Sequence, residues 1–269
     1  MENPKIDICL AGVTGWVGRA LYNEINLSGD LNLTSAVSRK QAGKNISEVF
    51  NSHGIDIIID KSVPDALEKK CDVLIDYTSP LIVKDNVLFA ISRKVNVVIG
   101  TSGLSEKDFE EINDAAVHNS VGVLAAGNFS ITAVLLQHFA QIAVKHIPNW
   151  EIFDYATEHK PDAPSGTTRE LANRLANIQQ PAIHYPIDQT IGDKSSRGAT
   201  IGGMQLHSVR LPGFNFSFEI IFGLPNERLS IRHDSGNGAE PYVNGTLLAV
   251  RKVNSFVGLK RGLDTLLNI

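Results

Sequence analysis

Cysteine is scarce in this chain of 269 residues, which has only Cys9 and Cys71. Two cysteines cannot form a disulfide framework or a four-thiolate zinc site, and the histidines share no ligand spacing with them, so we expect no metal site. Basic residues are not in excess either, because 25 Lys and Arg face 29 Asp and Glu. A chain with that balance lacks the positive surface that holds nucleic acid or an anionic membrane.

Long apolar runs are also missing, since none approaches 18 residues, and the sequence therefore predicts no membrane-spanning helix. Residues 1–7 include Glu2, Lys5 and Asp7, where a secretory signal needs an apolar core. Hydrophobic residues make up 43% of the chain and charged residues 20%, as in ordinary globular proteins of one or two domains. These features favour a cytoplasmic globular enzyme.

The first half of the chain alternates between short apolar runs and segments with helical spacing. Strands are predicted over residues 6–11, 33–37, 55–59, 73–77, 95–99 and 121–125. Helices are predicted over residues 15–27, 80–93 and 105–118, the last one opened by a capping pair, Ser105 and Asp108. Because parallel neighbours need crossover helices, this alternation predicts an α/β fold with a doubly wound parallel sheet.

The rhythm changes after residue 129. We expect helices over residues 131–146 and 167–175, a strand over 150–155 and a mobile loop over 189–203. Antiparallel strands are predicted over residues 203–210, 216–222 and 228–233, and helical spacing returns over 241–253 and 258–267. This tail is expected to pack back on the first domain.

A glycine-rich turn links the first predicted strand to the first predicted helix. Its sequence is Gly12-Val13-Thr14-Gly15-Trp16-Val17-Gly18. Glycines at this place let backbone amides approach a pyrophosphate at a helix N-terminus, where the dipole and free N–H groups favour an anion. The spacing is GxxGxxG rather than GxGxxG, and a tight turn without a ligand is the alternative.

The second predicted strand ends in Ser38-Arg39-Lys40. A cofactor with a free ribose 2′-hydroxyl usually meets Asp or Glu at this place. Two cations and a hydroxyl suit a 2′-phosphate instead, which favours NADPH over NADH. The alternative is a solvated basic loop.

A third motif is Lys160-Pro161-Asp162-Ala163-Pro164-Ser165-Gly166-Thr167. A lysine precedes a proline-bounded turn, and Ser165, Gly166 and Thr167 then begin a helix. Two hydroxyls, free backbone amides and an ammonium group could together hold a carboxylate. An N-capped helix beside a surface lysine explains the same residues without a ligand.

At this point the sequence resembles the dihydrodipicolinate reductases, enzymes of the diaminopimelate–lysine pathway, over nearly its whole length. The segments that carry the resemblance are the Gly12–Gly18 loop, Val73-Leu74-Ile75-Asp76-Tyr77-Thr78, Gly100-Thr101-Ser102-Gly103, Asn128-Phe129-Ser130, the Lys160–Thr167 motif and His207-Ser208-Val209-Arg210.

The resemblance implies an N-terminal Rossmann domain, residues 1–129 with 240–269, and a C-terminal α+β domain, residues 130–239. The second domain would bind substrate and build a homotetramer through a mixed sheet. The implied reaction is hydride transfer from NAD(P)H, with NADPH preferred, to a cyclic dicarboxylate with a conjugated imine. Lys160 would donate the proton, Ser165, Gly166 and Thr167 would bind a substrate carboxylate, and the cofactor would also be bound by Thr78, Gly100, Thr101, Ser102, Gly127, Asn128 and Phe129.

Two departures from the family pattern concern the substrate half. The family usually carries a His-His pair three and four residues before the lysine, where this chain has Ala156 and Thr157. An arginine usually follows the segment that reads His233-Asp234-Ser235 here, and none does. A paralogous imine or ketone reductase for another carboxylated substrate is therefore the alternative function, and a non-catalytic NADP sensor is a third.

Two histidines remain as candidates for the missing imidazole. His159 directly precedes Lys160, but adjacent residues on a strand face opposite sides. His207 lies in a predicted strand, where an isolated histidine is more often structural than catalytic.

Overall fold

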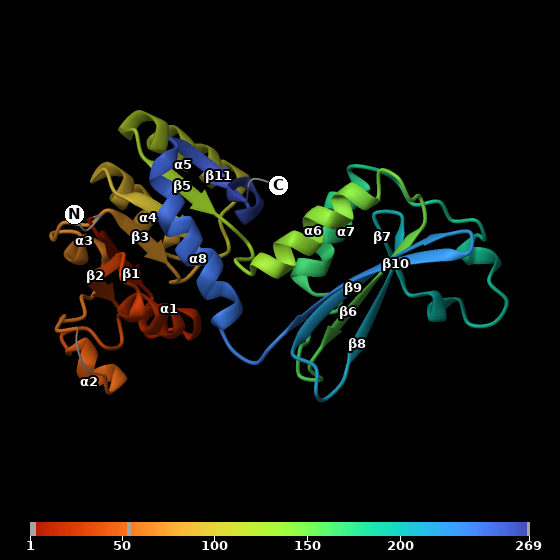
Figure 1. Ribbon diagram of the computed structural model, residues 1–269, viewed down its shortest axis with the longest axis horizontal. Coiled ribbons are helices and arrows are strands. Elements are labelled where there is room, and N and C mark those ends of the chain that lie inside the picture. The colour runs from red at the N-terminus through yellow and green to blue at the C-terminus, as the bar shows by residue number, and fades with distance from the viewer. Residues whose placement is uncertain (1–3, 53–54, 268–269) are drawn as a thin grey trace. The chain divides into compact units, whose positions relative to one another are not determined.

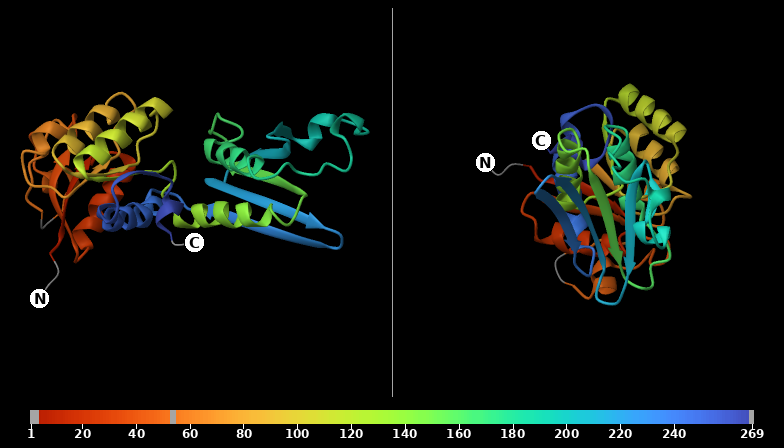
Figure 2. Two further views of the ribbon diagram at one scale, coloured as in Figure 1. Left: turned by 90° about the horizontal axis from the view of Figure 1, so that it is seen from above. Right: turned by 90° about the vertical axis from the view of Figure 1, so that its right-hand side faces the viewer.

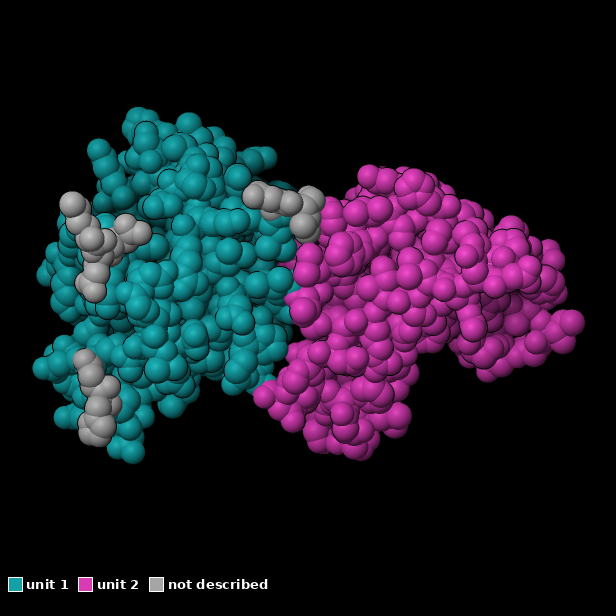
Figure 3. Space-filling model, in the orientation of Figure 1, with its two compact units in different colours: residues 1–131, 238–268 teal, residues 132–237, 269 magenta. Residues whose placement is uncertain are grey.

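The computed structural model describes residues 4–52 and 55–267. The first three of residues 1–7, where the sequence lacks the apolar core of a secretory signal, lie outside the described residues. The chain divides into two compact units (Figure 3). The first takes the residues up to 131 and those from 238 onward, and the second takes residues 132–237. Among the described residues, no helix has the length and apolar character needed to cross a membrane.

The first unit is built on a six-stranded sheet in the order β11-β5-β4-β3-β1-β2 (Figure 1). All neighbouring strands run parallel. This confirms the predicted doubly wound α/β sheet. The strands are β1 (Ile6–Ala11), β2 (Leu31–Val37), β3 (Val73–Asp76), β4 (Asn96–Ile99), β5 (Gly122–Ala125) and β11 (Gly258–Arg261).

Helices cover both faces of this sheet (Figures 1 and 2). One face packs against α4 (Val83–Ser92), α5 (Glu106–Asn119) and the short α3 (Val63–Ala66). The other face carries α1 (Trp16–Leu27) and α8 (Glu240–Lys252), which contact each other. A short helix, α2 (Ile46–Phe50), follows β2. The chain's last segment thus completes the first unit, with α8 on its face and β11 at its edge.

Two of the predicted elements in this unit are wrong. Residues 55–59 form no strand. Ile58 and the following Asp60 each make one isolated bridge, with Asn45 and Val37, and no continuous pairing connects them. The sixth strand is β11, where the leucine spacing of the tail predicts a helix. Gly258 is the first residue of β11 and Gly262 directly follows its last residue. Both glycines have positive φ angles, so no helix runs through this segment.

Two predicted helices of this unit are present, one of them with a different first residue. α4 begins at Val83 rather than at Pro80. The helix predicted at Ser105 is confirmed, and both hydrogen bonds of its capping box with Asp108 are present.

The second unit contains a five-stranded sheet in the order β10-β9-β6-β8-β7. β6 and β8 run parallel and the other pairs are antiparallel, which confirms the mixed sheet. The strands are β6 (Trp150–Ala156), β7 (Ala199–Ile201), β8 (Met204–Arg210), β9 (Phe216–Leu224) and β10 (Glu227–Ser235). The strands predicted over residues 216–222 and 228–233 are confirmed as the antiparallel pair β9 and β10, but β8 pairs with β6 and β7 and not with β9. The loop predicted over residues 189–203 contains β7.

One face of this sheet is covered by α6 (Ile131–Ala143) and α7 (Gly166–Ala176). Burial alternates strictly along β6, so Ile152, Asp154 and Ala156 face these helices. Glu151, Phe153 and Tyr155 point to the opposite face and are half-buried. The side chains on the helix-covered face thus lie close to the N-terminus of α7.

Candidate functional site

The glycine-rich turn lies between β1 and α1 and closely approaches the end of β3. Gly12 has a φ of +85°, and a Cβ built on it would lie 2.1 Å from the Tyr77 carbonyl oxygen. At Gly18 a Cβ would lie 2.2 Å from the Gly12 carbonyl oxygen. Gly15 is the N-cap of α1 and has no side chain to occupy the first amides of the helix. The Gly12 and Gly15 amides donate to the carbonyl oxygens of Val37 and Gly12. The first amides of α1 itself are left without a side-chain cap at a positive helix end, as an anion site requires.

A pocket of about 600 Å³ opens beside this turn. The lining includes the predicted residues Gly12, Thr14, Gly15, Ser38, Arg39, Lys40 and Thr78. Within the turn, the Thr14 and Ser38 hydroxyls are 2.8 Å apart and join the two loops. Val13 is buried, and Trp16 is largely exposed with its ring edge on Tyr242, 5.6 Å between centroids. Val13, Trp16 and Val17 are not among the lining residues.

The pocket also reveals cofactor-site candidates that the sequence did not indicate. Lys61 and Ser62 line it beside Arg39 and Lys40. They reach this place because the Ser38 amide donates to the Asp60 carbonyl oxygen, 3.1 Å away. Among the described lining residues, three cations face a single carboxylate, that of Asp85. The balance favours an anionic ligand group.

A fully buried carboxylate, Asp76, lies at the end of β3 next to the pocket. One oxygen accepts from the Thr78 amide at 3.0 Å, the Thr78 hydroxyl at 2.7 Å and the Thr101 hydroxyl at 2.6 Å. The other oxygen accepts from the Asn86 amide group at 2.8 Å. Asp76 thereby holds together two predicted cofactor residues from different strand ends.

The other predicted cofactor residues follow β4 and β5 at the same edge of the sheet. Gly100 packs against Tyr77, since a Cβ on it would lie 2.2 Å from the tyrosine ring. Ser102 and Gly127 are exposed, and Phe129 is buried with its ring 6.1 Å from that of Tyr77. The Asn128 side chain accepts from the Ser130 amide at 2.8 Å. Ligands of doubly wound sheets bind at this carboxyl edge.

In the second unit, the Lys160–Thr167 segment connects β6 to α7. Lys160 Nζ lies 2.7 Å from an Asp162 carboxylate oxygen, and this pairing lowers the pKa of Asp162. Ser165 is the N-cap of α7, and its buried hydroxyl accepts from the Thr168 amide at 3.3 Å. Gly166 is exposed and Thr167 half-buried. The accessible polar groups of this segment include the Lys160 ammonium with its Asp162 partner, the Gly166 backbone and the Thr167 side chain.

The substituted family positions lie just before this segment. Ala156 ends β6 with its side chain fully buried, and Thr157 follows outside the strand. His159 lies in a turn rather than on a strand, so the prediction that it faces away from Lys160 as a strand neighbour is wrong. Its side chain is 85% exposed and contacts only Glu158 among the ion pairs of the described residues, at 3.4 Å. His207 Nε2 donates to a Glu151 carboxylate oxygen at 2.8 Å, and its ring stacks on Phe153.

Both units match models of one protein family. Residues 6–129 match the family model described as "Dihydrodipicolinate reductase, N-terminus", and residues 132–266 match "Dihydrodipicolinate reductase, C-terminus". The 4-hydroxy-tetrahydrodipicolinate reductase of Desulfitobacterium hafniense is 36% identical over 265 residues, covering 98% of this chain and 99% of the relative. The enzyme of that name from Thermosynechococcus vestitus is 36% identical over 273 residues, covering 99% and 98%.

Solved structures agree. A dipicolinate-bound dihydrodipicolinate reductase from Paenisporosarcina sp. superposes with a TM-score of 0.88 at 27% identity, covering 97% of this chain and 99% of that one. An amine dehydrogenase from Mycobacterium smegmatis, with a TM-score of 0.65 at 11% identity, shares the fold alone. The family resemblance is thus confirmed over both units: this chain belongs to the dihydrodipicolinate reductase family.

Proposed function

We propose that this chain reduces 4-hydroxy-tetrahydrodipicolinate, the substrate named for its relatives, with NADPH as the preferred hydride donor. Family membership makes it an NAD(P)H-dependent oxidoreductase of diaminopimelate and lysine biosynthesis. The observation that carries the proposed substrate is the Lys160–Thr167 segment, where an ammonium group and a helix N-terminus are both accessible. A carboxylated ring is the ligand class that such a pair attracts.

The described residues of the first unit fit a dinucleotide. Gly12, Thr14 and Gly15 would hold the pyrophosphate, and Ser38, Arg39 and Lys40 the 2′-phosphate. Thr78, Gly100, Thr101, Ser102, Gly127, Asn128 and Phe129 would surround the nicotinamide end. When bound, reduced nicotinamide supplies the hydride. The preference for NADPH rests on the absence of an acidic side chain at residues 38–40 and on the added charge of Lys61.

In the second unit, the α7 N-terminus and the Thr167 hydroxyl would fix one substrate carboxylate. Lys160 would deliver a proton to the substrate nitrogen side as negative charge develops there. Both tasks are positioning and charge stabilisation, which is what a protein contributes when a cofactor performs the redox step. Ser165 supports this indirectly, because its buried hydroxyl caps the helix that presents Gly166 and Thr167.

The replaced histidine pair favours one alternative, a paralogous imine or ketone reductase for another carboxylated substrate. The test is a turnover assay on freshly generated synthase product, with NADPH and NADH compared. Rapid NADPH oxidation supports the proposed substrate. Slow wild-type turnover that improves in Ala156→His favours the alternative, and absence of turnover on any imine or ketone would support a cofactor sensor.

We further propose a cytoplasmic homotetramer, as the family resemblance implies. The face of the second unit's sheet opposite α6 and α7 carries the half-buried Phe153 and Tyr155. Apolar side chains on an uncovered sheet face suit a subunit contact. Sedimentation of the purified chain at equilibrium gives the assembly mass directly.

A further inference from the structure

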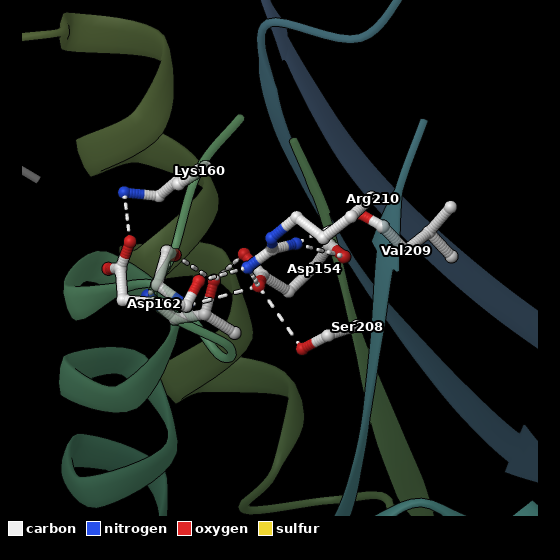
Figure 4. A network of polar contacts seen from close by, with 8 residues as sticks. Asp154, Lys160, Asp162, Ser208, Val209 and Arg210 are labelled. Atoms are coloured by element: carbon white, nitrogen blue, oxygen red, sulfur yellow. Dashed lines mark hydrogen bonds and ion pairs between the residues drawn. The ribbon is translucent and has the colours of Figure 1, made fainter. Parts of the chain in front are cut away.

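We propose that Asp154 and Arg210 are positioning residues that hold the Lys160–Thr167 segment in its carboxylate-binding shape. This inference rests on the proposed function, because it concerns the same segment. Neither residue belongs to that segment. Their contacts nevertheless fix both ends of its central turn (Figure 4).

Asp154 lies on β6 with its side chain completely buried beneath α7. Its carboxylate accepts from the Ser165 amide at 3.0 Å and from the Thr168 hydroxyl at 2.9 Å. It also accepts from the Ser208 hydroxyl at 3.3 Å and from Arg210 Nη2 at 2.7 Å. Burial raises the pKa of Asp154, but these hydrogen bonds outweigh it and leave the pKa below its ordinary value. The carboxylate is therefore ionised and anchors the first turn of α7.

Arg210 ends β8 and is paired with Ala156 in the β6–β8 register. The same Nη2 atom that contacts Asp154 also donates to the Asp162 carbonyl oxygen, 2.6 Å away. Nη1 donates to the Val209 carbonyl oxygen at 2.9 Å. The guanidinium thus joins the end of β8 to the turn that follows β6.

The geometry gives this pair its role. Arg210 fixes the turn at Asp162, and Asp154 fixes it at Ser165. Lys160 lies two residues before the first anchor, and Gly166 and Thr167 directly follow the second. The two anchors therefore set the distance between the ammonium group and the helix amides. A buried ion pair adds little to stability by comparison with well-packed apolar residues, so a role in specifying geometry explains its presence better.

The decisive experiment measures dipicolinate binding to the full-length chain by calorimetry, beside NADPH binding and thermal unfolding. Asp154→Asn retains the shape of the side chain but removes its charge and one acceptor. We expect dipicolinate affinity to fall by about 10-fold or more, since misplacing a binding group by about 1 Å has effects up to about 100-fold. NADPH affinity should stay within about twofold, since the predicted cofactor residues lie in the other unit.

A control on the same helix separates positioning from general damage. Glu170 forms a partly exposed ion pair with Arg174 on α7, 2.8 Å apart. Glu170→Gln should leave both affinities unchanged. If Asp154→Asn does not fold, Arg210→Lys keeps the charge while losing the guanidinium fork, and the same selective loss of dipicolinate binding is expected.

Coupling to a binding residue supplies a further readout. If the anchors act through the segment, Asp154→Asn should weaken dipicolinate binding much less when Thr167→Val is already present. Equal loss of both ligands with a lowered melting temperature would make the pair merely structural and overturn the proposal. Unchanged dipicolinate affinity in both anchor variants would also overturn it. A wild-type chain that binds dipicolinate but turns over no imine refutes the proposed function alone, whereas one that turns over the imine and keeps its dipicolinate affinity in both anchor variants refutes the anchor proposal alone.

Discussion

Lys160 Nζ lies 2.7 Å from an Asp162 carboxylate oxygen, so the proposed proton donor is held by a partner two residues further along the chain. Lys160→Ala should lower kcat by about 10²- to 10⁴-fold, the usual contribution of a general acid. KM for the substrate should rise as well, because the variant loses a charge partner for the carboxylate. Steady-state kinetics with saturating NADPH measures both, and full activity in this variant would remove Lys160 from the mechanism.

Asp162→Asn provides the comparison. Both partners of this ion pair are about one-third exposed, with side-chain accessibilities of 31% and 35%. Exposed pairs contribute at most about 1 kcal/mol, which corresponds to roughly a fivefold effect. We therefore expect kcat/KM to fall by no more than about fivefold. A loss as large as that of Lys160→Ala would mean that Asp162 itself touches the substrate.

Cofactor preference is predicted to depend on the cations of the pocket in the first unit. Arg39→Asp should weaken NADPH by about 1.5–3 kcal/mol, roughly 10- to 150-fold, and NADH much less, because only NADPH carries the 2′-phosphate. KM values for the two cofactors test this. An equal loss for both would place Arg39 away from the 2′-position.

Lys61 is predicted to add to the same preference. Lys61→Gln should raise KM for NADPH by roughly fivefold, about 1 kcal/mol for an exposed charge, and leave KM for NADH unchanged. The matched control is Lys44→Gln, since Lys44 is exposed in the same part of the chain but does not line the pocket. Identical effects of the two substitutions on KM for NADPH would mean that Lys61 acts only through the net charge of the protein and does not contact the cofactor.

Asp76 is expected to matter for both stability and cofactor binding. It accepts four hydrogen bonds while fully buried, and an asparagine can accept through only one of its two side-chain groups. Asp76→Asn should therefore destabilise the chain by about 1–3 kcal/mol and raise KM for NADPH, because Thr78 and Thr101 lose their common anchor.

A control for Asp76 lies at the opposite end of the same strand. The Asp72 carboxylate accepts from the Asp7 amide at 2.9 Å, far from the carboxyl edge of the sheet. Asp72→Asn should affect thermal unfolding but not KM for NADPH. If Asp76→Asn changes only the melting temperature, the carboxylate is a structural residue and no more.

Local signals explain what could be predicted from the sequence. The glycine turn, the Ser105 cap and the strand–helix alternation each depend on residues close in the chain. The sheet's sixth strand could not be predicted this way, because β11 has four residues and is defined by its pairing with β5, more than 130 positions earlier. The isoleucines of residues 55–59 favour a strand, yet a strand also needs a partner, and β2 bridges this segment only at Asp60.

The residues of the candidate site also divide into those that a local motif predicts and those that only the folded chain brings together. Lys160 and the start of α7 could be recognised because the motif is contiguous. Arg210 is 56 positions from Asp154, and Lys61 reaches the cofactor pocket only through the bridge between Asp60 and Val37. Arg210 lies within a family motif, His207–Arg210, but nothing in that motif points to Asp154 as its partner. Contacts of this kind arise from topology, and no spacing in the sequence encodes them.

The ionised Asp154 carboxylate is predicted to make the stability of the fold depend on acid pH. The pKa of Asp154 is lowered in the folded chain, although burial alone would raise it, because Arg210, Ser165 and Thr168 hydrogen-bond to the ionised form. The folded state therefore binds a proton less readily than the unfolded state, in which the pKa of an aspartate is about 3.9. The resulting stabilisation is complete above that value and is lost as the pH falls through it toward the lower folded-state pKa.

Thermal unfolding of the wild type and Asp154→Asn over a pH series tests this directly. At neutral pH the variant should melt at a lower temperature, because it leaves the Arg210 guanidinium buried beside a neutral group. The gap should stay constant down to about pH 5 and narrow below about pH 4, since the wild type then loses its charge while the asparagine cannot titrate. Other acidic groups titrate alike in both chains and cancel in the difference. A gap that does not change with pH would show that Asp154 stabilises the fold through its shape and hydrogen bonds rather than through its charge.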